Sequence, residues 1–172
     1  MNTPSTSTTG NVHGMALAAL SGPEPAELAS IGDFIPTIRP DRVALLGIRP
    51  LNASETALAR DSDVHLFTMS DIDRLALATV TQRALSHIGR GRADLHLSFD
   101  FDMCDPAIAP GVPPLAGRLS YREAHRLMEL VTDTGRLQAL DLVEVNPTVD
   151  THHNTAELAV QFGLATSGQR IL

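Results

Sequence analysis

The sequence predicts a three-layer α/β/α fold in which a mostly parallel β-sheet lies between two layers of helices. Short apolar runs, typical of strands that are buried on both faces, alternate along the chain with segments of helical periodicity. Such alternation is typical of βαβ units, whose strands run parallel and whose helices cover the sheet. With 172 residues, 43% of them apolar, the chain is long enough for one domain and can bury an ordinary core.

The order of the elements follows from local signals. Residues 1–41 are expected to be largely irregular, with a short helix at 13–20 and then a proline-rich loop. Residues 42–172 are expected to form the βα core. Within this core, strands are predicted at residues 43–48, 64–68, 95–101 and 139–145.

Helices are predicted between and after these strands, at 55–60, from 70 to 88, from 120 towards Gly135, and from a cap at Asn154 to about residue 163. Ser70 with Asp73 forms an approximate capping box for the second of these, and Ser120 precedes a better one. Because crossovers between parallel strands are right-handed, functional loops should gather at the carboxyl ends of the strands.

Composition excludes several classes of function. The net charge is −7 and there is no cluster of Lys and Arg, so a nucleic-acid partner is not expected. The apolar run at 15–20 is too short for a membrane span or a signal peptide. A single cysteine allows no intrachain disulfide, which fits a reducing compartment. We therefore expect a cytoplasmic protein with no membrane partner.

Two carboxylates lie close together at the end of the third predicted strand. Side chains alternate along a strand, so Asp100 and Asp102 should share one face. Such a pair would bind a hard divalent cation such as Mn²⁺ or Mg²⁺. Spacing alone leaves two alternatives open: a solvated acidic turn, and the Asp-x-Asp metal pair of a nucleotide-sugar transferase. An EF-hand is disfavoured, because Cys104, Asp105 and Gly111 stand where its loop needs other residues.

Three motifs, in the same order along the chain, resemble the ureohydrolase family and arginases in particular. Residues 98–106, Ser-Phe-Asp-Phe-Asp-Met-Cys-Asp-Pro, followed by Ala-Pro-Gly-Val at 109–112, resemble its metal signature. Leu-Asp-Leu-Val-Glu-Val-Asn-Pro at 140–147 is similar to an arginase segment. So are Asn-Thr-Pro at 2–4 and Thr-Gly-Asn-Val-His-Gly at 9–14.

This resemblance implies a hydrolase with a binuclear manganese centre that converts L-arginine to L-ornithine and urea. Asp100 and Asp102 match metal ligands, Glu144 matches the carboxylate that holds the guanidinium group, and His13 matches a proton-shuttle histidine. Taken singly, each would be assigned an ordinary surface or structural role. The residues matching positions that recognise the amino-acid end of the substrate are Asn2, Thr9, Asn11, Asn52 and Glu55.

The chain also departs from the family pattern. It contains neither the Asp-x-His-x-Asp motif nor the Gly-Gly-Asp-His segment that supply the other metal ligands. Asn52 replaces an acidic residue, Met103 replaces a common glycine, and Val-Pro-Pro at 112–114 is one residue shorter than the usual sequence. We therefore predict a partial arginase-like domain over residues 1–172 that lacks the N-terminal half and is inactive alone.

Several hypotheses about function stay open at this point. The chain could act as an arginase when an N-terminal half is supplied, or be a non-catalytic remnant that associates with intact subunits. An agmatinase-like ureohydrolase is disfavoured by Asn146-Pro147. The expected partners are L-arginine, further copies of the chain in a trimer or hexamer, as is common in the family, or the missing N-terminal half.

Overall fold

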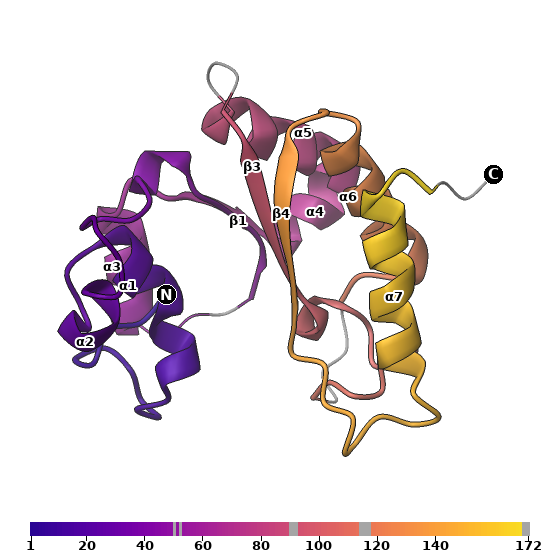
Figure 1. The fold of residues 1–172 in the computed structure, drawn as a ribbon, viewed down its shortest axis with the longest axis horizontal. Coiled ribbons are helices and arrows are strands. Elements are labelled where there is room, and N and C mark those ends of the chain that lie inside the picture. Colours follow the sequence, from indigo (N-terminus) through magenta and orange to yellow (C-terminus); the bar gives the residue numbers. More distant parts are fainter. Residues whose placement is uncertain (50, 52, 90–92, 114–117, 170–172) are drawn as a thin grey trace. The chain divides into compact units, whose positions relative to one another are not determined.

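The computed structural model describes residues 1–49, 51, 53–89, 93–113 and 118–169, and it divides into two compact units. Unit 1 is Met1–Thr68 and unit 2 is Met69–Leu172. Each unit contains helices and one pair of parallel strands (Figure 1). The predicted boundary between 1–41 and 42–172 separates an irregular region from the strands and helices, whereas these two units are separated by compactness. The predicted division therefore stays a prediction.

Unit 1 begins with short helices and ends in a βαβ unit. Strands β1 and β2 are parallel, with Ala44 opposite His65 and an irregularity after Leu46. There Gly47 has a φ of 74°, a left-handed conformation that glycine reaches without strain. The elements of unit 1 are η1 (Val12–Met15), α1 (Ala16–Ser21), α2 (Ala26–Ala29), η2 (Pro40–Arg42), β1 (Ala44–Ile48), α3 (Ala53–Asp61) and β2 (His65–Thr68).

Unit 2 contains the second parallel pair, β3 and β4. Leu95 lies opposite Leu137 and Asp100 lies opposite Val143, so the carboxyl ends of both strands meet at one edge. Figure 1 shows the two strands side by side, and α7 packs against β4 and α6. The elements of unit 2 are α4 (Met69–Leu75), α5 (Leu77–Ile88), β3 (Leu95–Asp100), η3 (Phe101–Met103), α6 (Tyr121–Thr132), β4 (Leu137–Val143) and α7 (Asn154–Thr166).

Three phenylalanines form the centre of the core of unit 2. Phe99, Phe101 and Phe162 are at most 2% exposed. The ring of Phe162 from α7 stacks on Phe101 with a centroid distance of 5.7 Å and meets Phe99 edge-on at 5.4 Å. These contacts attach the end of β3 and the turn after it to α7, so the backbone that carries Asp100 and Asp102 has a firm support.

The capping box predicted for α6 is confirmed. The Ser120 hydroxyl accepts a hydrogen bond from the Glu123 amide, and the Glu123 carboxylate accepts one from the Ser120 amide at 2.9 Å. The helix then buries an apolar stripe that includes Leu127 and Met128. It ends at Thr132, and Gly135 takes a left-handed φ of 64° in the turn that follows.

The helix predicted from 70 to 88 is instead two helices, α4 and α5. Ala76, with φ 63° and ψ 148°, separates them, and Ser70 lies inside α4 instead of capping it. Ile72 and Leu77 are 4% and 5% exposed. Five residues apart on one continuous helix they would point in different directions, so the break allows both to be buried.

The predicted strands are confirmed, with shifted ends. The fourth strand begins and ends two residues earlier than predicted, and the third ends at Asp100, one residue early. In the part of the chain that the structure describes, no helix is both long and apolar enough to cross a membrane.

Candidate functional site

Asp100 and Asp102 lie where β3 gives way to the turn η3. The Asp100 carboxylate accepts a hydrogen bond from the Asp102 amide at 2.7 Å and so acts as the N-cap of η3. The prediction that one continuous strand carries both residues is therefore wrong, because this capture of the Asp102 N–H starts a turn. Phe101 remains fully buried in the turn. Asp102 is thus positioned by the turn and not by strand alternation.

These carboxylates fit a manganese ion in kind but not in number. Carboxylate oxygens are donors that hard divalent cations prefer. Asp100 is an exposed residue at the end of its strand. Across the ranges that the structure describes, however, no group of three or more His, Cys, Asp or Glu side chains is arranged to hold a metal. A full coordination shell would need further donors from outside this segment.

Glu144 is the first residue after β4, and its backbone is strained. Val143, immediately before it, lies opposite Asp100 in the parallel ladder. Glu144 is therefore at the same edge of the β3–β4 pair as the two aspartates. Its φ is 62°, a left-handed conformation that costs a non-glycine residue roughly 1–2 kcal/mol. Strain of this kind concentrates at functional sites, where the surrounding structure holds it in place.

Three of the predicted substrate residues of unit 1, Asn2, Thr9 and Asn11, lie on one closed loop. The Asn2 amide donates to the Gly14 carbonyl at 3.0 Å, which joins the two ends of the loop. Inside it, the Asn11 amide donates to the Thr9 hydroxyl at 3.2 Å. His13 lies in η1 with its side chain exposed. Local hydrogen bonds thus bring Asn2 and His13 to the closed end of this loop.

Glu55, in α3, also faces this loop. Its carboxylate accepts a hydrogen bond from the Met1 amino group at 2.6 Å and is 14% exposed. Within unit 1 the structure therefore places Glu55 beside the segment that begins the loop. Two other predictions, on Asn52 and on Pro114 of the shortened loop, concern residues outside the described ranges.

Asp150 is a structural residue that sequence reasoning missed. Asn154 was predicted to cap α7 but is its first residue. The Asp150 carboxylate accepts the hydrogen bonds of the cap instead, from the Thr155 amide at 3.0 Å and the Ala156 amide at 3.1 Å. Burial by itself would raise the pKa of Asp150, but these bonds, with one from the Thr155 hydroxyl, outweigh it and lower the pKa.

The lowered pKa of Asp150 predicts a pH dependence of stability. The stabilisation is complete above the carboxyl's ordinary pKa of 3.8 and is lost as the pH falls through the lower folded value. We expect Asp150→Asn to lower the melting temperature at neutral pH, and the difference from wild type to shrink in strong acid. Thermal melts followed by circular dichroism across this range would measure it. A difference that does not change with pH would contradict the prediction, and Glu157→Gln on the same helix is the control.

Cys104 is a packed thiol in the core. The side chain is 0% exposed, and burial raises its pKa to about 12. At neutral pH it is therefore protonated and shielded, as in a thiol that serves packing.

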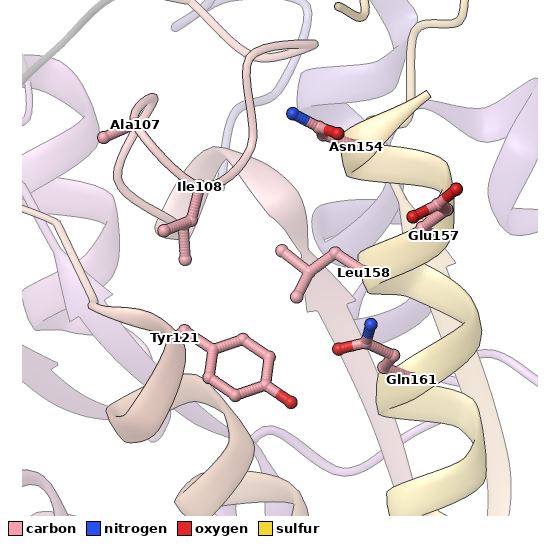
Figure 2. A pocket seen from close by; sticks show the side chains of 7 residues that line it. All are labelled: Ala107, Ile108, Tyr121, Asn154, Glu157, Leu158 and Gln161. Carbon is pink, nitrogen blue, oxygen red and sulfur yellow. The ribbon is translucent and has the colours of Figure 1, made fainter. Parts of the chain in front are cut away.

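A shallow hollow of about 310 Å³ lies beside the first turns of α7 (Figure 2). It contains none of the residues predicted for the site, and Figure 2 shows Ile108 and Leu158 facing each other across it. Its lining residues are Ala107, Ile108, Tyr121, Asn154, Glu157, Leu158 and Gln161.

Comparison with known proteins decides the family. The model of the arginase family matches residues 1–167. This chain belongs to the arginase family. The arginase of Brevibacillus brevis is 38% identical over 173 residues, and that of Bacillus caldovelox is 36% identical. Each match covers 100% of this chain and 58% of the relative, so the chain spans a little over half the length of these arginases.

Solved arginases share the fold. The structure of the Bacillus caldovelox arginase matches with a TM-score of 0.94 at 37% identity, covering 99% of this chain and 57% of that one. A crystal structure of Bacillus subtilis arginase matches with a TM-score of 0.93 and covers 60% of that chain. Proclavaminate amidino hydrolase from Streptomyces clavuligerus matches less well, with a TM-score of 0.62 at 28% identity over 73% of this chain. The predicted arginase-like α/β fold is confirmed.

Proposed function

We propose that this chain carries part of the active site of an arginase that hydrolyses L-arginine to L-ornithine and urea. The observation that supports this most is the register of β3 and β4. Asp100 lies opposite Val143, so Asp100, Asp102 and the strained Glu144 are all at the carboxyl ends of these two strands. A guanidinium group pairs with a carboxylate through two charge-assisted hydrogen bonds. A cation site next to such a carboxylate suits hydrolysis of a guanidino compound.

Each predicted residue has a role in this proposal. Glu144 binds the guanidinium group and orients its carbon towards the metal-binding end of β3. His13 transfers a proton at its imidazole to the leaving amine, a task that suits the pKa range of histidine. The polar residues of the unit 1 loop and α3 bind the amino-acid end of the substrate: Asn2, Thr9, Asn11 and Glu55, with Asn52 as a weaker contact because it is neutral.

Asp100 and Asp102 would hold manganese. When bound, the metal would supply a nucleophile at neutral pH and stabilise developing negative charge. Because these two residues alone cannot complete a binuclear site, the remaining ligands must come from residues outside this segment. We therefore propose that the isolated chain binds Mn²⁺ weakly and that Asp100→Ala abolishes this binding. A cytoplasmic location and a trimeric or hexameric assembly also belong to the proposal.

A chimera tests the function. The part of Brevibacillus brevis arginase that precedes the region matched by this chain would be fused to residue 1, since the chain covers 58% of that protein. With Mn²⁺, we expect the chimera to release urea from L-arginine and the 172-residue chain alone to release none above background. A colorimetric urea assay measures both, and Asp102→Asn in the chimera is the inactive control.

Each outcome separates the hypotheses. Clear urea release by the pure 172-residue chain would contradict the proposed incompleteness. A chimera that loads Mn²⁺ yet leaves L-arginine intact would favour the non-catalytic alternative. Hydrolysis of agmatine in preference to L-arginine would favour an agmatinase-like enzyme.

A further inference from the structure

We propose that Thr155 is a positioning residue, whose buried hydroxyl holds the loop after Asp102 against the segment after Glu144. In this way it sets the spacing between the metal carboxylates and the guanidinium-binding carboxylate. The chemical consequence rests on the proposed function, whereas the mechanical coupling of the two segments does not. We call the contact of Thr155 with Gly111 and Asp150 the threonine clamp.

Both hydrogen-bonding capacities of the Thr155 hydroxyl are used across the clamp. It accepts a hydrogen bond from the Gly111 amide at 2.9 Å and donates one to the Asp150 carboxylate at 2.9 Å. The side chain is 0% exposed, so water does not compete for either bond. Because the carboxylate can only accept here, the hydroxyl proton points to Asp150 and a lone pair faces Gly111. The arrangement is thus fixed in one orientation.

Gly111 fits so closely that a Cβ in place of its hydrogen would make its neighbours shift by a few tenths of an ångström. A Cβ built there would lie 3.0 Å from the Thr155 hydroxyl oxygen, 3.3 Å from the Asn146 carbonyl oxygen and 3.3 Å from the Asp150 Cβ. These neighbours belong to α7 and to the segment after Glu144. The backbone at Gly111 is therefore wedged between both, and the clamp locks it there.

Tight turns connect the clamp to the site residues on both sides. On one side the Ala109 amide donates to the Asp105 carbonyl at 3.0 Å in a turn, and the Asp105 amide anchors that turn by donating to the Leu119 carbonyl, further along the chain, at 2.9 Å. On the other, the Thr148 amide donates to the Asn146 side chain at 3.0 Å, two residues after Glu144. Because these hydrogen bonds tie each segment to the site residue on its own side, we expect that releasing the clamp would let the two segments move relative to each other.

Distances between spin labels would test the clamp in the full chain. Labels would be attached at Ala107→Cys and Thr148→Cys, which are exposed on the two segments, while the buried Cys104 stays unlabelled. Pulsed electron paramagnetic resonance should give a narrow distance distribution for the labelled chain with Thr155 intact and for the labelled Thr155→Ser variant. Thr155→Val keeps the shape but removes the hydroxyl, and we expect it to broaden or shift the distribution.

The matched control is Thr166→Val. Among the residues that the structure describes, its hydroxyl bonds only within α7, to the Gly163 carbonyl at 2.8 Å, so its loss should leave the distribution narrow. A folded Thr155→Val chain with the wild-type distribution would overturn the proposal. If that variant does not fold, Gly111→Ala, which pushes the loop away from the intact hydroxyl, must give the same broadening, and a folded Gly111→Ala with no change would overturn it equally.

Kinetics in the chimera test the consequence for the site. We expect Thr155→Val to lower kcat/KM for L-arginine by about 10- to 100-fold, since small misplacements of a binding group cost that much. Thr155→Ser should restore the rate and Thr166→Val should not affect it. An inactive wild-type chimera would count against the proposed function, whereas the distance distributions would still decide the clamp. Unchanged kinetics in an active Thr155→Val chimera would overturn the positioning role.

Discussion

Replacing Phe162 by alanine is expected to lower the free energy of unfolding by about 3–5 kcal/mol. The side chain is 0% exposed, and its ring contacts both Phe99 and Phe101. Alanine would leave a cavity that these rigid neighbours cannot fill. Because Phe101 lies between Asp100 and Asp102 in the chain, the change would also loosen the metal-binding turn. Urea denaturation followed by circular dichroism gives the free energy directly.

The control for this prediction is Val160→Ala on the same helix. Val160 is 63% exposed, so its truncation should change the free energy of unfolding by no more than about 0.5 kcal/mol. If Phe162→Ala unfolded at the same urea concentration as Val160→Ala, the three phenylalanines could not be the centre of the core.

Glu144→Gln in the chimera is expected to lower kcat/KM for L-arginine by about 30- to 5,000-fold. Glutamine keeps the size of the side chain but removes its charge, and losing one partner of a charged hydrogen-bonded pair costs about 2–5 kcal/mol. Steady-state urea release at saturating Mn²⁺ would measure the effect. The melting temperature should hardly change, because the left-handed backbone at Glu144 stays as it is.

Glu157→Gln is the matched control for this second prediction. Glu157 is an exposed glutamate on α7 that lines the hollow and is not one of the predicted site residues. It should have wild-type kinetics. Full activity of Glu144→Gln would remove Glu144 from the site and leave its backbone strain without a function.

Much of the fold could be predicted from the sequence because its signals are local. The capping box at Ser120 and Glu123 lies within four consecutive residues, and the apolar runs of the strands need no knowledge of their partners. The break at Ala76 could not be predicted in this way. It exists because Ile72 and Leu77 are both buried, which depends on what packs around them.

The residues of the candidate site differ in the same way: some have a local signal in the sequence, and others depend on the folded chain. Asp100 and Glu144 stand in motifs that can be read along the chain, and the parallel register then places them at one edge. Thr155 gives no such signal, because a threonine in the first turn of a helix looks the same whether it is exposed or buried. Its partner Gly111 is 44 residues away, and only the folded chain brings them together.

At Glu144, the residue that would be best for folding stability differs from the residue that the proposed chemistry needs. Glycine enters the left-handed region freely, so it would relieve about 1 kcal/mol of backbone energy there, although it would also make the unfolded chain more flexible. A screen for heat-resistant variants that measured folding alone would therefore select glycine in place of this glutamate. Such a screen should keep residue 144 fixed, since the more robust protein would have lost its proposed grip on the substrate.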